Sequence, residues 1–198
     1  MDAVQTTEIR WWKASKPTDM PEFGAPVKFS IDGVEVEAPE GASVLNAAIA
    51  AGLYIPALCA HPDLPPASQR GAGDGGCNLC MVEVDGEEGL QKACSMPARA
   101  GLVLKTQSPE IQKARQGSLA KILGPHPHVC LTCPQREGCS RTTCSFGNPV
   151  ETRCCSIFSN CELRKVSDFI GIPGSTPAYK PAQLPIIKDE PFFDRDYN

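Results

Sequence analysis

The stretch GGCNLCMVEV, residues 75–84, decides the fold of the N-terminal half of this chain. Two cysteines separated by two residues are followed at once by a run in which apolar and polar side chains alternate, the pattern of a half-buried β-strand. The glycines before them let the backbone approach a bound group closely and turn its amides toward an anion. The stretch therefore predicts a ligand-bearing loop that leads directly into a sheet.

A hairpin and a helix are predicted upstream of this loop. The run VKFSIDGVEVEAP, which begins at Val27, alternates around Asp32-Gly33 and predicts two strands joined by a tight turn. The run VLNAAIAA follows, with Ser43 placed to cap a helix and Gly52 placed to end it. An antiparallel hairpin followed by one helix is therefore expected.

More short strands are predicted downstream. MVEVDG and LQKAC are separated by an Asp85-Gly86 turn, and GLVLKT follows them. Ser108 is expected to cap a second helix with Pro109 at its first position. This order predicts the α+β fold class, with a small mixed sheet wrapped on one helix. The second helix is expected to bury one stripe: Ile111, Ala114, Ser118, Leu119 and Ile122.

Composition narrows the possible functions. The 198 residues include eleven cysteines and carry a formal charge of -4. Nucleic-acid binding is disfavoured, because such proteins need a basic stripe that this sequence lacks. No secretory signal or membrane-spanning run is recognised, so a cytoplasmic location is expected. In a reducing cytosol, cysteines at this density are more often metal ligands than disulfides, and the odd count and the adjacent Cys154-Cys155 pair agree.

Four cysteines form a first group around the opening stretch. A 2Fe-2S cluster needs four thiolates, and a Cys-x2-Cys pair with one remote cysteine on each side is a usual arrangement. Zinc accepts the same four ligands. The spacing alone thus leaves both possibilities open for Cys59, Cys77, Cys80 and Cys94.

The remaining seven cysteines all lie between residues 125 and 172, where apolar periodicity is weak. Such a segment cannot build an ordinary core, so bound metal is expected to supply the cross-links. The run HPHVCLTCPQREGC, residues 126–139, places a histidine four residues before a Cys-x2-Cys pair and a third cysteine six residues after it. A zinc site with three cysteines and one histidine is compatible with this spacing.

Residues 27–106 resemble the β-grasp ferredoxin domain that begins the large iron-sulfur subunit of NADH:quinone oxidoreductase (complex I). They are also similar to the diaphorase subunit of NAD-reducing hydrogenases and related formate dehydrogenases. The resemblance is carried by IPALCAHPDL, GGCNLCMVEV and ACSMPA, although the loop at 60–76 is longer and richer in glycine. It implies a 2Fe-2S cluster on the first group of cysteines.

The same families continue into a helix and a His-Pro-x-x-Cys-x2-Cys-x5-Cys segment that binds a 4Fe-4S cluster. The resemblance implies the ligands His126, Cys130, Cys133 and Cys139. Replacing a thiolate with an imidazole makes a cluster less negative, which raises its potential in Rieske centres. His128 does not match the motif, and His61 is interpreted as structural or as a partner of a ligand.

The last four cysteines have no counterpart in that resemblance. A second 4Fe-4S cluster is the first hypothesis for them, followed by zinc, and then by a mixture in which one cysteine is free. Ligand exchange with the preceding group is a further possibility. The residues concerned are Cys144, Cys154, Cys155 and Cys161.

Four segments are predicted along the chain. PFFDRDYN at its end is similar to the stretch that, in the resembling subunits, leads into a two-cluster ferredoxin domain, so that domain is expected as a separate polypeptide or as the missing part of a longer chain. The segments are an extended arm with Trp11-Trp12 (1–25), the β-grasp 2Fe-2S domain (26–107), a helix with the His/Cys cluster domain (108–172) and a proline-rich strap (173–198).

No Rossmann fingerprint, P-loop or Ser-His-Asp set is found, so the chain is expected to have no catalytic site of its own. The resemblance implies an electron-transfer subunit that relays single electrons between a flavin subunit oxidising NADH and a catalytic oxidoreductase partner. The alternative is a zinc-stabilised structural or adaptor protein. A redox sensor would also need a partner-binding surface that the sequence does not indicate.

Overall fold

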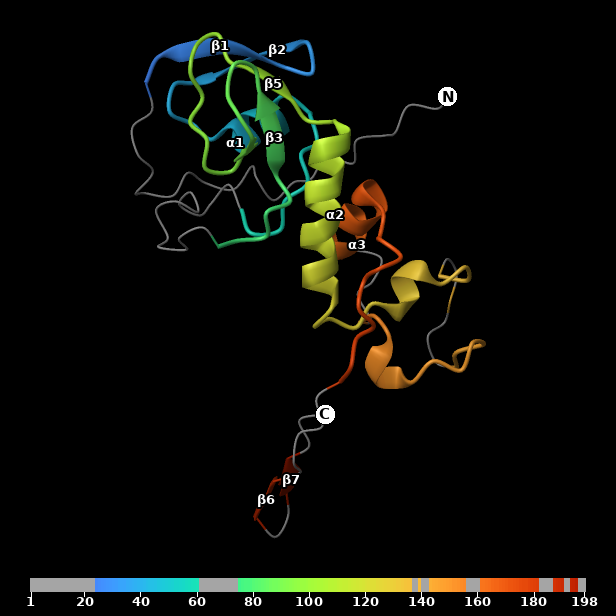
Figure 1. Ribbon diagram of the computed structural model, residues 1–198. Coiled ribbons are helices and arrows are strands. Elements are labelled where there is room, and N and C mark those ends of the chain that lie inside the picture. Colours follow the sequence, from blue (N-terminus) through green and yellow to red (C-terminus); the bar gives the residue numbers. More distant parts are fainter. Residues whose placement is uncertain are drawn as a thin grey trace. The chain divides into compact units, whose positions relative to one another are not determined.

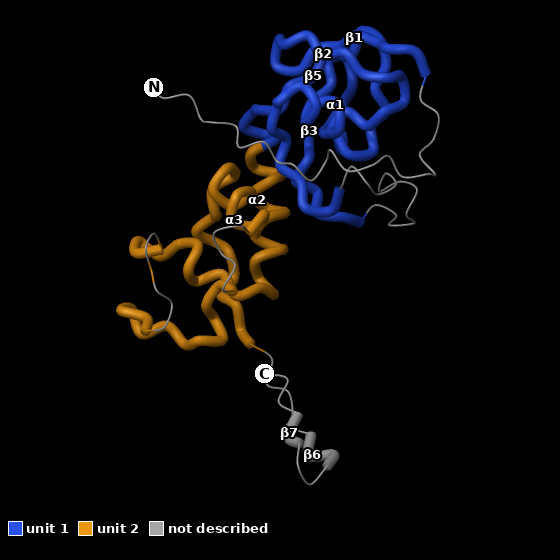
Figure 2. The backbone as a smooth tube through the Cα atoms, turned by 180° about the vertical axis from the view of Figure 1, so that it is seen from behind, with its two compact units in different colours: residues 1–111 blue, residues 112–198 orange. Residues whose placement is uncertain are grey.

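The computed structural model describes residues 24–60, 75–136, 139, 143–155 and 161–181, together with the backbone of 187–190 and 193–195. It divides into two compact units, residues 1–111 and 112–198 (Figure 2). The predicted arm with Trp11-Trp12 and the residue His61 lie outside the described residues.

The first unit contains a five-stranded mixed sheet (Figure 1). Its strand order is β2-β1-β5-β3-β4, in which β1 and β5 are parallel and the other neighbours are antiparallel. The strands are β1 (Pro26–Ile31), β2 (Val34–Pro39), β3 (Met81–Val84), β4 (Leu90–Lys92) and β5 (Val103–Lys105).

The predicted turn at Asp32-Gly33 is confirmed. Both residues have positive φ, 50° and 81°, as the tight turn between β1 and β2 requires. The Asp32 carboxylate also accepts hydrogen bonds from the backbone N–H of Thr106, at 2.8 Å, and from its hydroxyl. The hairpin turn is thereby tied to the end of β5.

Helix α1 (Val44–Ala50) lies against the sheet and completes the core of this unit (Figure 1). Its predicted cap is confirmed, because the Ser43 hydroxyl accepts from the backbone N–H of Asn46 at 3.1 Å. Alternate residues of the strands face the helix, as the binary pattern predicts. The α+β class is thus confirmed for this unit, whose core includes Phe29, Ile31, Val36, Val44, Leu45, Val82, Val84 and Leu104.

The second unit is built on two helices, α2 (Pro109–Leu123), of which residues 112–123 belong to this unit, and α3 (Glu162–Ile170) (Figures 1 and 2). The Gln112 side chain donates to the carbonyl of Ile170 at 2.5 Å. The first turn of α2 within the unit is therefore next to the last turn of α3, and the two helices run antiparallel.

The predicted stripe on α2 was partly wrong. The helix buries every fourth residue, Ile111, Arg115, Leu119 and Leu123, while Ala114, Ser118 and Ile122 are only half-buried. Arg115 was missed because its charge marks it as a surface residue, although only 2% of it is exposed. At this exposure the guanidinium is buried together with the methylenes, which requires polar partners from elsewhere in the fold and gives no signal in a binary pattern.

Short elements complete the described part of the second unit. Two 3-10 turns, η3 (Val129–Thr132) and η4 (Val150–Thr152), lie in the cysteine-rich segment. Near the end of the chain, β6 (Ile187–Glu190) pairs antiparallel with β7 (Phe193–Arg195), where an extended strap was expected. Among the residues described, no helix is both long and apolar enough to cross a bilayer.

Candidate iron-sulfur sites

Four thiols converge in the first unit. The backbone N–H of Cys77 donates to Sγ of Cys59 at 3.4 Å, and the N–H of Leu58 donates to Sγ of Cys77 at the same distance. The Cys80 thiol is hydrogen-bonded to Cys94, and its ionisation is opposed by both Cys94 and Cys77. The structure thus brings together all four cysteines predicted to hold the first cluster.

The buried half of this site is fixed by the core. Cys80 and Cys94 are 1% and 6% exposed. The N–H of Ala93 donates to the carbonyl of Cys80 at 3.0 Å, which extends the pairing of β3 and β4 as far as the ligands. The N–H of Leu45, in the first turn of α1, donates to the carbonyl of Ala93 at 3.0 Å. Helix and sheet together hold these two sulfur atoms in place.

The loop before β3 has a conformation suited to close packing around sulfur. Gly76 has φ of +112°, and a Cβ built there would lie 3.3 Å from Sγ of Cys59. Asn78 also has positive φ, 51°, and Leu79 is fully buried as the anchor of the loop. The cysteine spacing predicts the ligands, but the need for Gly76 and the anchoring by Leu79 become evident only in three dimensions.

Two thiols of this group, those of Cys80 and Cys59, favour the protonated form when no cation is near. The hydrogen bond to Cys94, followed by burial, raises the pKa of Cys80 above its usual range, and burial raises the pKa of Cys59. Four adjacent thiolates repel each other unless positive charge lies between them. Clustered thiols, amide donors and a position without Cβ fit a 2Fe-2S cluster, whose irons provide that charge.

Two histidines precede the cysteine pair of the second unit. Nδ1 of His126 lies 2.7 Å from the carbonyl of Pro127, and Nδ1 of His128 lies 2.8 Å from the carbonyl of His126. A carbonyl only accepts, so each Nδ1 carries a proton, and in the neutral form of the ring Nε2 keeps a lone pair for a metal. His126 is exposed, whereas His128 is 9% exposed. Both rings therefore leave Nε2 as the nitrogen that can bind a metal.

The loop with Cys130 and Cys133 is anchored by an arginine that sequence reasoning missed. Arg136 donates to the carbonyl of Leu131 at 3.2 Å and pairs with Asp168 on α3 at 2.7 Å. The N–H of Cys133 also donates to the carbonyl of Cys130 at 3.3 Å. A charge pair between a loop and a helix gives no local sequence pattern, which explains why it was missed.

Cys154 lies beside Cys130. The Cys130 thiol and the backbone N–H groups of Cys130 and Leu131 are near enough to influence its ionisation. Burial, followed by the neighbouring Cys130, raises the pKa of Cys154 to about 12. A cysteine from the third predicted group is thus near a cysteine from the second.

Cys144 has a different environment. The backbone N–H groups of Asn148 and Phe146 and the Asn148 side-chain amide, at 3.4 Å, donate to its sulfur and hold the pKa of Cys144 below its usual value. Arg153 adds a nearby positive charge. The thiolate of Cys144 is therefore stabilised without a metal, unlike that of Cys154.

The remaining predicted ligands lie at different places in the second unit. Cys139 and Cys155 are exposed, whereas Cys161 is half-buried and occupies the N-cap position of α3. Cys161 thus precedes the helix whose Asp168 anchors the loop of Cys130 and Cys133.

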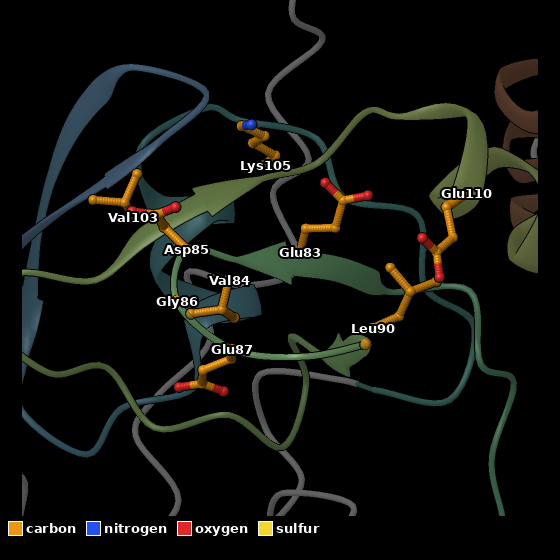
Figure 3. A pocket seen from close by; sticks show the side chains of 10 residues that line it. Glu83, Val84, Asp85, Gly86, Glu87, Leu90, Val103, Lys105 and Glu110 are labelled. Atoms are coloured by element: carbon orange, nitrogen blue, oxygen red, sulfur yellow. The ribbon is translucent and has the colours of Figure 1, made fainter.

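A separate shallow pocket of about 290 Å³ lies on the first unit (Figure 3). It is lined between β3, the turn after it and β5 by four carboxylates and Lys105, and no cysteine lines it. A shallow pocket lined mainly by charged side chains is typical of a solvated surface, so it is not assigned to the site. The carboxylates belong to Glu83, Asp85, Glu87 and Glu110.

Comparison with known proteins agrees with this geometry. Residues 24–109 match the family described as a 2Fe-2S iron-sulfur cluster binding domain. The chain is 37% identical over 113 residues to an NADH-quinone oxidoreductase subunit of Rickettsia prowazekii, covering 57% of this chain and 16% of that protein. It is 36% identical over 115 residues to the mitochondrial NADH-ubiquinone oxidoreductase 78 kDa subunit of Candida albicans, covering 58% of this chain and 15% of that protein.

A solved structure is also similar. It is a crystal structure of an NAD+-reducing [NiFe]-hydrogenase in the H2-reduced state, matched with a TM-score of 0.53 and 26% identity over 80% of this chain and 55% of that one. The chain aligns with about a sixth of the length of the oxidoreductase subunits named above. Residues 24–109 therefore match a 2Fe-2S iron-sulfur cluster binding domain, and the chain is similar to subunits of NADH-quinone oxidoreductases.

Proposed function

We propose that this chain is an electron-transfer subunit that relays single electrons between a flavin subunit oxidising NADH and a catalytic oxidoreductase partner. The observation that carries the proposal is the convergence of Cys59, Cys77, Cys80 and Cys94 inside a domain that matches a 2Fe-2S family. The strand order supports the β-grasp form of that domain. A 2Fe-2S cluster bound there supplies a one-electron redox couple.

Residues of this chain determine the surroundings of the bound cluster and therefore its redox potential. The buried Cys80 and Cys94 keep water away from half of the site, while the N–H groups of Leu58 and Cys77 donate to its other sulfurs. Such hydrogen bonds to sulfur and the degree of burial are the means by which a protein tunes the potential of a cluster. Cys59 and Cys77 are only half-buried, which leaves this edge accessible for exchange of electrons.

In the second unit we propose 4Fe-4S sites. His126, Cys130, Cys133 and Cys139 follow the motif of the resembling families, and the lone pair left on Nε2 of His126 supports its role. Cys144, Cys154, Cys155 and Cys161 provide enough thiols for a second 4Fe-4S cluster. The small apolar core of this unit supports both, because bound clusters would cross-link segments that few side chains hold together.

The partners follow from the relatives, which are named as subunits of NADH-quinone oxidoreductases and of an NAD+-reducing hydrogenase. A flavin subunit that binds NADH is expected on one side of the relay, and a catalytic oxidoreductase subunit on the other. A separate two-cluster ferredoxin domain is a further expected partner. A cytoplasmic location is part of this proposal.

Anaerobic purification of the chain tests the proposal. A brown protein is expected, with acid-labile sulfide, about ten iron atoms if all three sites are filled, and visible absorption that dithionite bleaches. Cys80→Ser should lose about two of these iron atoms and the 2Fe-2S paramagnetic signal, whereas Ser95→Ala, next to Cys94, should retain both. A colourless protein that contains zinc and no sulfide would instead identify the adaptor described above.

The relay itself needs the native complex. When the complex is copurified with its flavin subunit, NADH should reduce the clusters of this chain within the turnover time of the complex. If clusters that dithionite reduces stay oxidised with NADH, the proposed position in the relay is wrong, even though the cofactors are present.

A further inference from the structure

The loop that bears Cys130 and Cys133 is held from both sides by one residue, Arg136. Nη1 of Arg136 donates to the carbonyl of Leu131, which lies between the two cysteines in the sequence, at 3.2 Å. The backbone N–H of Arg136 donates to the carbonyl of Cys133, also at 3.2 Å. Because a guanidinium stays protonated in proteins, the loop gains a permanent positive charge together with these hydrogen bonds.

The same nitrogen ties the loop to helix α3. Nη1 of Arg136 lies 2.7 Å from Oδ1 of Asp168, and Nε of Arg164 lies 3.6 Å from Oδ2 of the same carboxylate. The side chains of Arg136 and Asp168 are 30% and 39% exposed, and water and salt screen partly buried charges less than fully exposed ones. Two positive charges and one negative charge therefore leave a net positive charge beside the loop.

This charge has a direct consequence for a bound cluster. Leu131 already gives the loop an apolar anchor, with 6% of it exposed, and a partly exposed ion pair adds little stability. What the ion pair adds is a positive charge at a fixed place next to the ligands. Reduction gives a cluster one more negative charge, which a nearby cation favours, so the charge raises the reduction potential. The cluster concerned, the histidine-bound cluster, is the one proposed at His126, Cys130, Cys133 and Cys139.

We propose that Arg136 is a positioning residue of the histidine-bound cluster, which fixes the loop of Cys130 and Cys133 and raises the reduction potential of the cluster. Asp168 orients the guanidinium and moderates this effect, because its carboxylate offsets part of the positive charge. The inference rests on the proposed function, since it needs a cluster at this site. It adds to the ligands a charged pair that adjusts how readily the cluster accepts an electron.

Four single substitutions in the full chain test this role. Arg136→Gln removes the positive charge, whereas Arg136→Lys keeps it and can offer its one nitrogen to both acceptors, as Nη1 does. Asp168→Asn removes the opposing charge, while its amide oxygen can still accept from Nη1. Lys165→Gln is the matched control, because it removes a positive charge from α3 that belongs to an exposed ion pair with Glu162.

The readout is the midpoint potential of the histidine-bound cluster in a redox titration. Its signal is identified in pulsed electron paramagnetic resonance of the reduced protein by the ¹⁴N coupling of a coordinated imidazole. The 2Fe-2S signal of the first unit serves as an internal control for folding. Iron and acid-labile sulfide are measured on the same samples.

Arg136→Gln is expected to lower the midpoint potential and Asp168→Asn to raise it, whereas Arg136→Lys and Lys165→Gln stay near the wild-type value. A purely structural role would not give shifts of opposite sign. The inference is overturned if Asp168→Asn leaves the potential unchanged or lowers it, or if Arg136→Gln leaves it unchanged.

Loss of the histidine-bound cluster in Arg136→Gln, with the 2Fe-2S signal intact, would support the positioning role. The direction of the shift in Asp168→Asn would then decide whether the charge also sets the potential. A wild-type protein without acid-labile sulfide would be a different result, because it would refute the proposed function and not merely the role of Arg136.

Discussion

The backbone N–H of Cys77 donates to Sγ of Cys59 across 3.4 Å, which joins two cysteines that are 18 residues apart in the sequence. The contact depends on Gly76, whose position leaves room for that sulfur. The first unit therefore has a ligand pocket in which backbone and thiol are fitted to each other. Substitutions that disturb this pocket, or the contacts in the second unit, should change cluster binding or stability.

Gly76→Ala should impair the 2Fe-2S site. The new Cβ would lie 3.3 Å from Sγ of Cys59, and alanine at φ of +112° costs about 1–3 kcal/mol in backbone strain. We expect loss of the 2Fe-2S absorption and of about two iron atoms. Gly86→Ala is the matched control, because Gly86 also has positive φ, +77°, but open space around its Cβ position. Equal iron loss in both variants would contradict the role of Gly76.

The histidine ligand can be identified by comparing His126 and His128. His126→Ala should abolish the ¹⁴N coupling of the histidine-bound cluster, and His126→Cys should keep the cluster while lowering its midpoint potential, because a thiolate adds negative charge. Redox titration and pulsed resonance measure the two effects. His128→Ala should keep the coupling, although it removes a buried ring. Loss of coupling only in His128→Ala would transfer the ligand role to His128.

In chain prepared without iron, the cysteine thiols should become reactive in a defined order as the pH rises. The pKa of Cys144 lies below its ordinary value of 9.0, and that of Cys154 is raised to about 12. The thiolate fraction grows as pH rises through the pKa, so at pH near 8 iodoacetamide should modify Cys144 much faster than Cys154. The difference should shrink as pH approaches 12.

Mass spectrometry of peptides after timed alkylation measures this order. In denaturant the two cysteines should react at similar rates, which provides the control. Equal rates in the folded chain at pH 8 would show that the hydrogen bonds from Asn148 and the burial of Cys154 do not persist in solution.

The raised pKa of Cys154 also links the stability of the folded chain to pH. In iron-free chain the folded state keeps Cys154 protonated, while in the unfolded state this thiol ionises near pH 9.0. Its contribution is complete below that pH and is lost progressively as pH rises toward about 12. Denaturant midpoints measured between pH 7 and 11 should therefore fall at alkaline pH, and Cys154→Ser should flatten the decline.

Thr106→Val should destabilise the first unit. The Thr106 hydroxyl and N–H both donate to the Asp32 carboxylate, and only 5% of Thr106 is exposed. Removing one donor from a charged acceptor costs about 1–3 kcal/mol. Thermal unfolding of the iron-loaded chain, followed by the 2Fe-2S absorption, measures the change. Ser95→Ala, which removes an exposed hydroxyl, should shift the midpoint little.

The sequence was most informative where signals are local. Asp32-Gly33 specified its turn through positive φ, and Ser43 specified a helix start through one hydroxyl. It failed on α2, where Arg115 is buried in the folded chain although its charge predicts exposure, because local patterns do not register tertiary packing. Arg136 and Asp168 escaped detection for the same reason, since they are 32 residues apart and meet only in the folded chain.

The sequence by itself determined which atoms are available for chemistry, because cysteine spacing, strand alternation and turn residues all act over a few positions. It therefore predicted the four cysteines that the structure brings together in the first unit, and the strands that carry them. Only the tertiary structure decided which thiols are neighbours in the second unit, where Cys154 is next to Cys130. The spacing of cysteines along the chain cannot show which of them share a site when loops fold back on each other. Contact between two cysteines is set by the path of the backbone and not by the number of residues that separate them.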